Sequence, residues 1–172
     1  MTRFADALTA LSLLDWAWFF GVWVGVTLLL WLVVRVVGVR ASRFFWRTAT
    51  QLDDYLADLL HATRWFFLIA VGLYVAVLTL EVTPLVRLRF TQLAFLALIV
   101  QGVIWFNRIL ARYVEHTTRG RVEEDPGAVT TVQAVGFVGR LVAYSVALLL
   151  ALSNLGFEVG PLIASLGIGG IA

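Results

Sequence analysis

Residues 16–34 read WAWFFGVWVGVTLLLWLVV and contain no charged side chain. An α-helix rises about 1.5 Å per residue, so roughly 20 such residues cross the hydrocarbon core of a bilayer. This stretch is therefore long and apolar enough to form a membrane-spanning helix. Asp6 and Asp15 precede it and no small-residue cleavage site ends it, which is unlike a signal peptide.

The composition of the whole chain points to the same class of protein. Of 172 residues, 61% are hydrophobic and 14% are charged, and the mean hydropathy is +0.92. A soluble domain is about half apolar and about a quarter charged. There is no cysteine, which excludes disulfides and thiolate metal sites, and the net charge of +2 does not indicate a nucleic-acid partner. We therefore predict an all-α integral membrane protein without a cofactor.

Further apolar stretches extend this pattern along the chain. Residues 65–80, 90–106 and 141–157 predict three more spans, the last of them starting near Val129. Residues 159–172 begin a fifth helix, which at about 21 Å stops part-way across the membrane. We expect about five transmembrane helices, the last one incomplete.

An amphipathic helix is predicted between the first two spans. Its apolar stripe has helical spacing and consists of Leu52, Tyr55, Leu56, Leu59 and Leu60. The expected organisation is a first transmembrane helix in 1–40, a cytoplasmic-side amphipathic helix in 41–64, the second and third transmembrane helices in 65–115, a loop in 116–128, and the fourth helix with the start of the fifth in 129–172.

The arginines predict the orientation, because positively charged residues favour the cytoplasmic side of a membrane. Most of them flank the first and third connections, and the sequence contains no lysine. The topology-setting residues are Arg35, Arg40, Arg43, Arg47 and Arg64 at the first connection, and Arg108 and Arg112 before the third. We therefore expect a multi-pass protein of the cell (inner) membrane, with its N-terminus outside and its C-terminal end directed to the cytoplasm.

Small residues dominate the closing stretch SLGIGGIA, residues 165–172. It matches G-x-G-x-x-A, but a dinucleotide site needs a preceding strand and a following helix, and neither is predicted here. Gly160, Ala164 and Gly167 instead form one helical row, and Ser165, Gly169 and Ala172 form a second. Small residues on two faces let a helix approach neighbours on two sides. That is the geometry of a pore lined by one helix from each subunit.

No catalytic site is predicted. Asp54, Asp58 and His61 share a helix face that we interpret as solvated rather than metal-binding, and the second histidine, His116, has no partner at ligand spacing. The few polar residues within the spans, such as Gln101, are expected to hydrogen-bond between helices. An enzyme is not indicated.

The C-terminal sequence LLLALSNLGFEVGPLIASLGIGGIA, residues 148–172, resembles the start of the pore-forming helix of the small-conductance mechanosensitive ion channels, with the end of the preceding helix. Residues 125–127 (DPG) and 50–60 (TQLDDYLADLL) are similar to the larger members of that family. The resemblance implies a homo-heptamer in membrane lipid that opens under tension and passes ions and small solutes on osmotic downshock.

By this resemblance, specific residues of the last helix acquire expected roles. Ile171 falls at a pore constriction that the family usually fills with leucine. Ala164, Gly167, Gly170 and Ala172 fall at packing positions between neighbouring pore helices. The family pattern continues beyond Ala172 with a second constriction and a cytoplasmic vestibule, so we expect either a fragment cut within the pore helix or a truncated product that cannot gate as the family does.

Two other functions remain open at this point. Glu81-Val82-Thr83-Pro84-Leu85 recurs as Glu158-Val159-Gly160-Pro161-Leu162, which could mark the repeated hairpins of a secondary transporter. A membrane anchor or scaffold without conduction is the third hypothesis.

Overall fold

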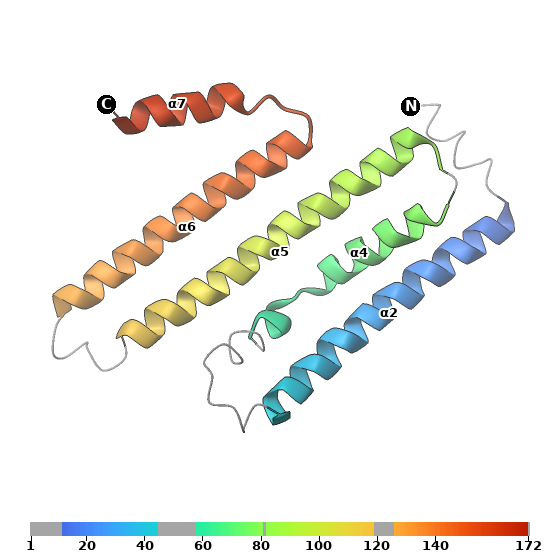
Figure 1. Cartoon of the computed structure of the whole chain (residues 1–172), viewed down its shortest axis with the longest axis horizontal. Helices are drawn as coiled ribbons and strands as arrows, with labels where there is room; N and C mark the ends of the chain where they lie inside the picture. Colours follow the sequence, from blue (N-terminus) through green and yellow to red (C-terminus); the bar gives the residue numbers. More distant parts are fainter. Residues whose placement is uncertain (1–11, 45–57, 81, 119–125, 172) are drawn as a thin grey trace. The chain divides into compact units, whose positions relative to one another are not determined.

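The computed structural model describes residues 12–44, 58–80, 82–118 and 126–171, with the side chains of 38–44, 126, 128 and 166–171 left out of the description. All regular structure within these ranges is helical (Figure 1). The helices are α2 (Leu13–Phe44), α4 (Trp65–Leu78), α5 (Pro84–Thr118), α6 (Pro126–Asn154) and α7 (Gly160–Ile171). The predicted all-α membrane class is confirmed.

Three of these helices are long and apolar enough to cross a membrane. They contain Leu13–Val37, Pro84–Thr118 and Val129–Asn154, and correspond to the first, third and fourth predicted spans. The second predicted span is the shorter helix α4, whose 14 residues extend about 21 Å. A bilayer core is about 30 Å thick, so α4 alone is shorter than the core.

The amphipathic helix expected over 41–64 is only partly described. α2 continues to Phe44, residues 58–62 are helical, and residues 63–64 are not. The middle of the predicted helix lies outside the described residues, so its amphipathic character stays a prediction.

A reciprocal cap starts α2. The backbone N–H and the hydroxyl of Ser12 both donate to the Asp15 carboxylate, at 2.9 Å and 2.8 Å, and the Asp15 N–H donates to the Ser12 hydroxyl at 3.2 Å. This arrangement satisfies backbone donors that a helix start leaves without an intrahelical partner. The helix therefore begins three residues before Trp16, where the uncharged stretch begins.

The connection between α5 and α6 is shorter than the predicted loop 116–128. α5 continues to Thr118, where the hydroxyls of Thr117 and Thr118 donate to carbonyls one turn earlier, at 2.8 Å each. α6 begins at Pro126, because proline needs no amide partner in the first turn of a helix. Polar residues that predict a loop can therefore belong to helix ends.

Among the described residues, α2 and α4 form the closest helix pair, and Figure 1 shows them side by side. Their buried cluster consists of Phe19 from α2 with Ala76, Val77 and Leu80 from the end of α4 and the residues after it. In lipid the hydrophobic effect does not drive helices together, so close packing has to hold this pair.

Gly72 allows α4 to pack closely against α2. A Cβ atom built on Gly72 would overlap the Thr27 hydroxyl and would lie 3.2 Å from the Trp23 carbonyl oxygen. The Thr27 hydroxyl is buried and has no hydrogen-bond partner among the described residues. One turn earlier on α2, the Trp23 indole N–H donates to the Ile69 carbonyl at 3.3 Å.

The chain forms two compact units, residues 1–109 and residues 110–172. The first contains α2, α4 and most of α5. The second contains the last turns of α5 with α6 and α7, which is where the sequence places function.

Candidate functional site

A tight turn joins α6 to α7. The Gly156 N–H donates to the Ser153 carbonyl and the Phe157 N–H donates to the Leu152 carbonyl, both at 3.0 Å. This is the Schellman pattern, which satisfies the last carbonyls of a helix. Gly156 has φ +95°, a conformation that residues with a Cβ atom rarely adopt. Glycine at this position therefore lets α6 stop and α7 begin within a few residues.

α7 begins directly after this turn. The Ile163 N–H donates to the Val159 carbonyl at 3.0 Å, and Pro161 occupies the first turn, where it needs no amide partner. The Ser165 hydroxyl donates to the Leu162 carbonyl of its own helix at 2.8 Å. The side chains of residues 161–165 are all exposed within this single chain. The described part of α7 thus has free faces on its first turns.

The structure describes some of the predicted pore residues more fully than others. Gly160, Ala164 and Gly167 lie on one continuous helix, so the predicted row of small residues has the required helical backbone. Ala164 is exposed. Gly167, Gly170 and Ile171 belong to α7, but their side-chain surroundings lie outside the description, as does the whole of Ala172. Their packing and constriction roles stay predictions.

Two glycines let α6 pack against the last turns of α5. A Cβ atom on Gly136 would lie 2.9 Å from a Val114 methyl group, and one on Gly139 would lie 3.3 Å from a Leu110 methyl group. The Ser145 hydroxyl further along α6 donates to the Leu141 carbonyl of the same helix at 2.9 Å. α6 therefore packs against α5 within its first half, and the Ser145 hydroxyl is satisfied within its own helix.

The described arginines of the predicted topology lie on α2, on α5 and directly before α4. The Arg35 guanidinium is 4.9 Å from the centroid of the Trp31 ring, a cation–π contact on the exposed surface of α2. Arg64 is exposed directly before α4, Arg108 is exposed on α5, and Arg112 is half-buried on α5. Arg40 and Arg43 lie on α2 with side chains outside the description, and Arg47 lies outside the described residues.

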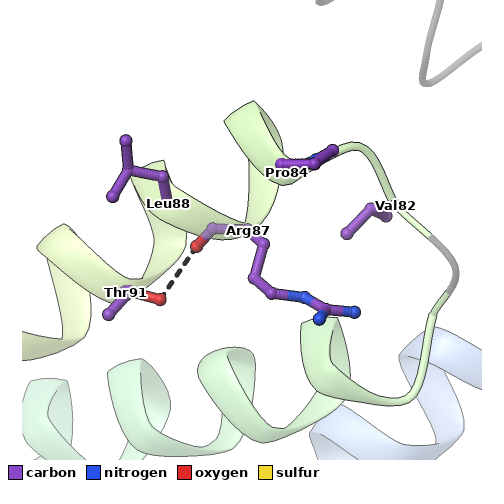
Figure 2. Close-up of a pocket in the computed structure, with 5 residues that line it drawn as sticks. All are labelled: Val82, Pro84, Arg87, Leu88 and Thr91. Carbon is purple, nitrogen blue, oxygen red and sulfur yellow. Dashed lines mark hydrogen bonds between the residues drawn. The ribbon is translucent and has the colours of Figure 1, made fainter.

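A shallow pocket of about 350 Å³ lies beside the start of α5. Figure 2 shows Arg87 and Leu88 extending in different directions from the first turns of this helix, while the Thr91 hydroxyl donates to the Arg87 carbonyl at 2.9 Å. Val82 and Pro84 complete the lining. One exposed cation and apolar side chains do not form a catalytic set, so we assign no chemistry to this pocket.

Metal ligands are not gathered in the part of the chain that the structure describes. No group of three or more His, Cys, Asp or Glu side chains could hold an ion there. Asp54, one of the three residues that share the predicted polar face, lies outside the described residues.

Comparison with known proteins places the α6–α7 hairpin in a family. The family signature described as "Mechanosensitive ion channel, transmembrane helices 2/3" matches residues 137–172, which contain most of α6, the Gly156 turn and α7. The large-conductance mechanosensitive channel MscMJLR of Methanocaldococcus jannaschii is 32% identical over 136 residues. The chain belongs to the mechanosensitive ion channel family. This confirms the family predicted from residues 148–172.

The match with this relative covers the two proteins unequally. The aligned region is 77% of this chain and 37% of the relative, so the chain spans about a third of the length of that channel. No solved structure gives a significant match. Both matches are to channels rather than to enzymes.

Two side chains on α5 make contacts that the sequence does not specify. They are Gln101, which the sequence predicts to hydrogen-bond between helices, and Trp105. Both bond to the backbone just before α4. Their spacing of four residues is the signal that could have paired them, since it puts both on one face of a helix.

Proposed function

We propose that this chain is the membrane-embedded part of a tension-gated channel subunit, which releases ions and small solutes on osmotic downshock. The observation that carries the proposal is the family match over residues 137–172, which coincides with the α6–turn–α7 hairpin. The rest of the proposal rests on the sequence of α7 and on the geometry of the helices before it.

In this proposal α7 lines the pore of a homo-heptamer. Exposed side chains at residues 161–165 leave the first turns of α7 available to neighbouring copies. Ala164, Gly167, Gly170 and Ala172 are the contacts between neighbouring pore helices, because small residues allow backbones to approach closely. Ile171 forms part of an apolar constriction, which blocks ions by excluding water without needing a plug.

α2, α4 and α5 couple the bilayer to this pore. Their surfaces carry large exposed apolar side chains, including Trp18, Leu28, Trp31 and Leu98, which suit contact with lipid. Membrane tension favours the state with the larger area in the plane of the membrane. A channel with closed and open states is then shifted toward the open one, as any ligand shifts a two-state equilibrium. The arginines support an orientation with the N-terminus outside and the end of α7 directed to the cytoplasm of the cell (inner) membrane.

Osmotic survival tests this function. The complete protein is expressed in cells that lack their own tension-gated channels and die on downshock. We expect it to rescue survival, and we expect Gly167→Val or Gly170→Val to reduce the rescue by disturbing contacts between pore helices. Gly21→Val on α2 is the control, because a Cβ atom there meets nothing within 4 Å. Absence of rescue by the expressed wild-type protein would contradict the proposal, and saturable uptake of a solute would instead favour a transporter.

A further inference from the structure

The chain is not helical at residues 63–64, between the helical residues 58–62 and α4. Arg64 is the N-cap residue of α4, with an extended backbone (φ −87°, ψ 148°), and its side chain makes no capping hydrogen bond. A helix break leaves backbone N–H and C=O groups without intrahelical partners. At membrane depth such groups need partners from neighbouring elements, since lipid offers none.

Gln101 on α5 supplies two of these partners. The Arg64 N–H donates to the Gln101 side-chain oxygen at 3.0 Å, and the Gln101 side-chain amide donates to the Ala62 carbonyl at 3.2 Å. Gln101 is completely buried, and it is the only buried polar or charged residue among those the structure describes. One side chain therefore satisfies a donor within the break and an acceptor directly before it.

Trp105 adds a second contact one turn further along α5. Its indole N–H donates to the Leu59 carbonyl at 3.0 Å and to the Thr63 hydroxyl at 3.2 Å, while that hydroxyl donates to the Leu59 carbonyl at 3.0 Å. The Trp105 ring also packs edge-to-face on Phe67, with the ring centroids 5.9 Å apart. Gln101 and Trp105 thus bond the chain before and within residues 63–64, and the Trp105 ring also contacts the chain after them.

The chemistry of these contacts requires particular side chains. A carboxamide presents an acceptor oxygen and a donor nitrogen about 2 Å apart, so one Gln can bond a backbone N–H and a backbone C=O together. Methionine has a side chain of similar length but offers neither strong group. Asparagine has both groups on a shorter chain. The indole of Trp105 is a donor only, which matches the two oxygens it contacts.

We propose that Gln101 and Trp105 form a junction clamp that fixes the start of α4 to α5. Gln101 is a positioning residue: it bonds the N–H of Arg64, the N-cap residue of α4, and holds residues 62–64 in their non-helical form. The clamp makes the segment before α4 and the middle of α5 one mechanical element, so a displacement of residues 59–64 is passed to α5 as well as to α4. This inference goes beyond the channel function, because it depends only on contacts within the first unit.

Amide hydrogen exchange of the complete protein in liposomes tests the clamp. In Gln101→Met we expect the Arg64 amide to exchange about tenfold faster than in wild type, because its hydrogen bond to Gln101 is lost. The faster exchange should be confined to peptides covering residues 59–67. Gln133→Met is the matched control, because Gln133 is exposed on α6, and its exchange pattern should equal that of wild type. An unchanged Arg64 amide in folded Gln101→Met would overturn the proposal.

Trp105→Phe is a second test of the clamp, for use if Gln101→Met does not fold. Phenylalanine retains an aromatic ring for Phe67 but removes the indole donor, so we expect faster exchange of the amides at residues 60–64, by about threefold. Equal exchange in this variant and in wild type would overturn the role of Trp105 in the clamp. Hydrogen exchange does not depend on channel activity. A protein that passes no current would therefore contradict the proposed function without affecting the test of the clamp.

Discussion

The first unit of the chain has side-chain hydrogen bonds to distant segments in addition to bonds within its helices, such as the bond from Thr91 to Arg87. In the first unit, side chains reach across to the backbone of another segment: Trp23 bonds to Ile69, and Gln101 bonds to residues 62 and 64. In the second unit, the Ser145 and Ser165 hydroxyls bond to the preceding turn of their own helices. The first unit is thus held by contacts between distant segments of one chain, whereas residues 161–165 of α7 in the second unit have exposed side chains.

This difference has a physical basis in the bilayer. Lipid tails are as apolar as leucine, so helices associate in a membrane through close packing and hydrogen bonds. The first unit has both, at Gly72 and at the junction clamp. The second unit has close packing at Gly136 and Gly139 of α6, but α7 has exposed side chains throughout residues 161–165.

The largest expected effect is at Gly72, where the first unit is packed most tightly. Gly72→Ala puts a methyl group onto the Thr27 hydroxyl and close to the Trp23 carbonyl oxygen, so α2 has to shift to make room for it. We expect a loss of about 1–3 kcal/mol in the free energy of unfolding, the usual cost of overpacking. Denaturant titration in detergent measures it.

Gly25→Ala on α2 is the control for this substitution, since a Cβ atom there meets nothing within 4 Å and no loss is expected. Thr27→Ala should partly restore stability to Gly72→Ala, because it removes the overlapping hydroxyl. If Gly72→Ala and Gly25→Ala behave alike, the α2–α4 contact does not specify the first unit.

The next largest effect is expected at the turn between α6 and α7. Gly156→Ala forces a residue with a Cβ atom into φ +95°, which costs about 1–2 kcal/mol. The same titration measures the loss, with Gly102→Ala as a control in open space and at an ordinary helical φ. Wild-type stability in Gly156→Ala would show that the turn can be made without the left-handed glycine.

A smaller effect is expected for a single hydrogen bond in the first unit. Trp23→Phe keeps an aromatic ring but removes the indole donor to Ile69, which should cost about 0.6 kcal/mol, the average for hydrogen bonds between membrane helices. Trp18→Phe is the matched control, because Trp18 is 64% exposed. A larger loss in the control than at Trp23 would contradict a specific contact between α2 and α4.

The smallest effects are expected for the serines of the second unit. Ser145→Ala and Ser165→Ala each remove a bond to the same helix, so unfolding free energies should stay within about 0.5 kcal/mol of wild type. A larger loss of unfolding free energy in either variant than in Trp23→Phe would contradict the difference between the two units. Such a result would show that the hydroxyl has a partner in a neighbouring copy.

Much of the fold could be predicted from sequence, because membrane spans depend on length and apolar composition alone. The helix containing residues 16–34 and the turn before Pro161 are encoded by such local signals. Helix ends were less predictable, since Pro126 begins α6 inside the predicted loop, and the α5 helix continues through Thr118. Pro and polar residues occur both in loops and at helix ends.

The site was predictable where it depends on local sequence and not where it depends on distant contacts. The row formed by Gly160, Ala164 and Gly167 is visible in the sequence, and the helix that it needs is present. The bonds of Gln101 and Trp105 to residues 59–64 join positions some 40 residues apart, so no periodic pattern could reveal them. A local sign of that contact is Arg64 at the N-cap position of α4, because its side chain makes no capping hydrogen bond.

Pressure-clamp recording of the complete protein, purified and reconstituted in liposomes, tests the central claim most directly. Suction is applied in steps to an excised patch while current is measured. The account predicts that channels open above a reproducible tension and close when it is released, with a threshold shifted in Gly167→Val and unchanged in Gly21→Val. Silence of the reconstituted wild-type protein up to the rupture of the patch would contradict a tension-gated channel.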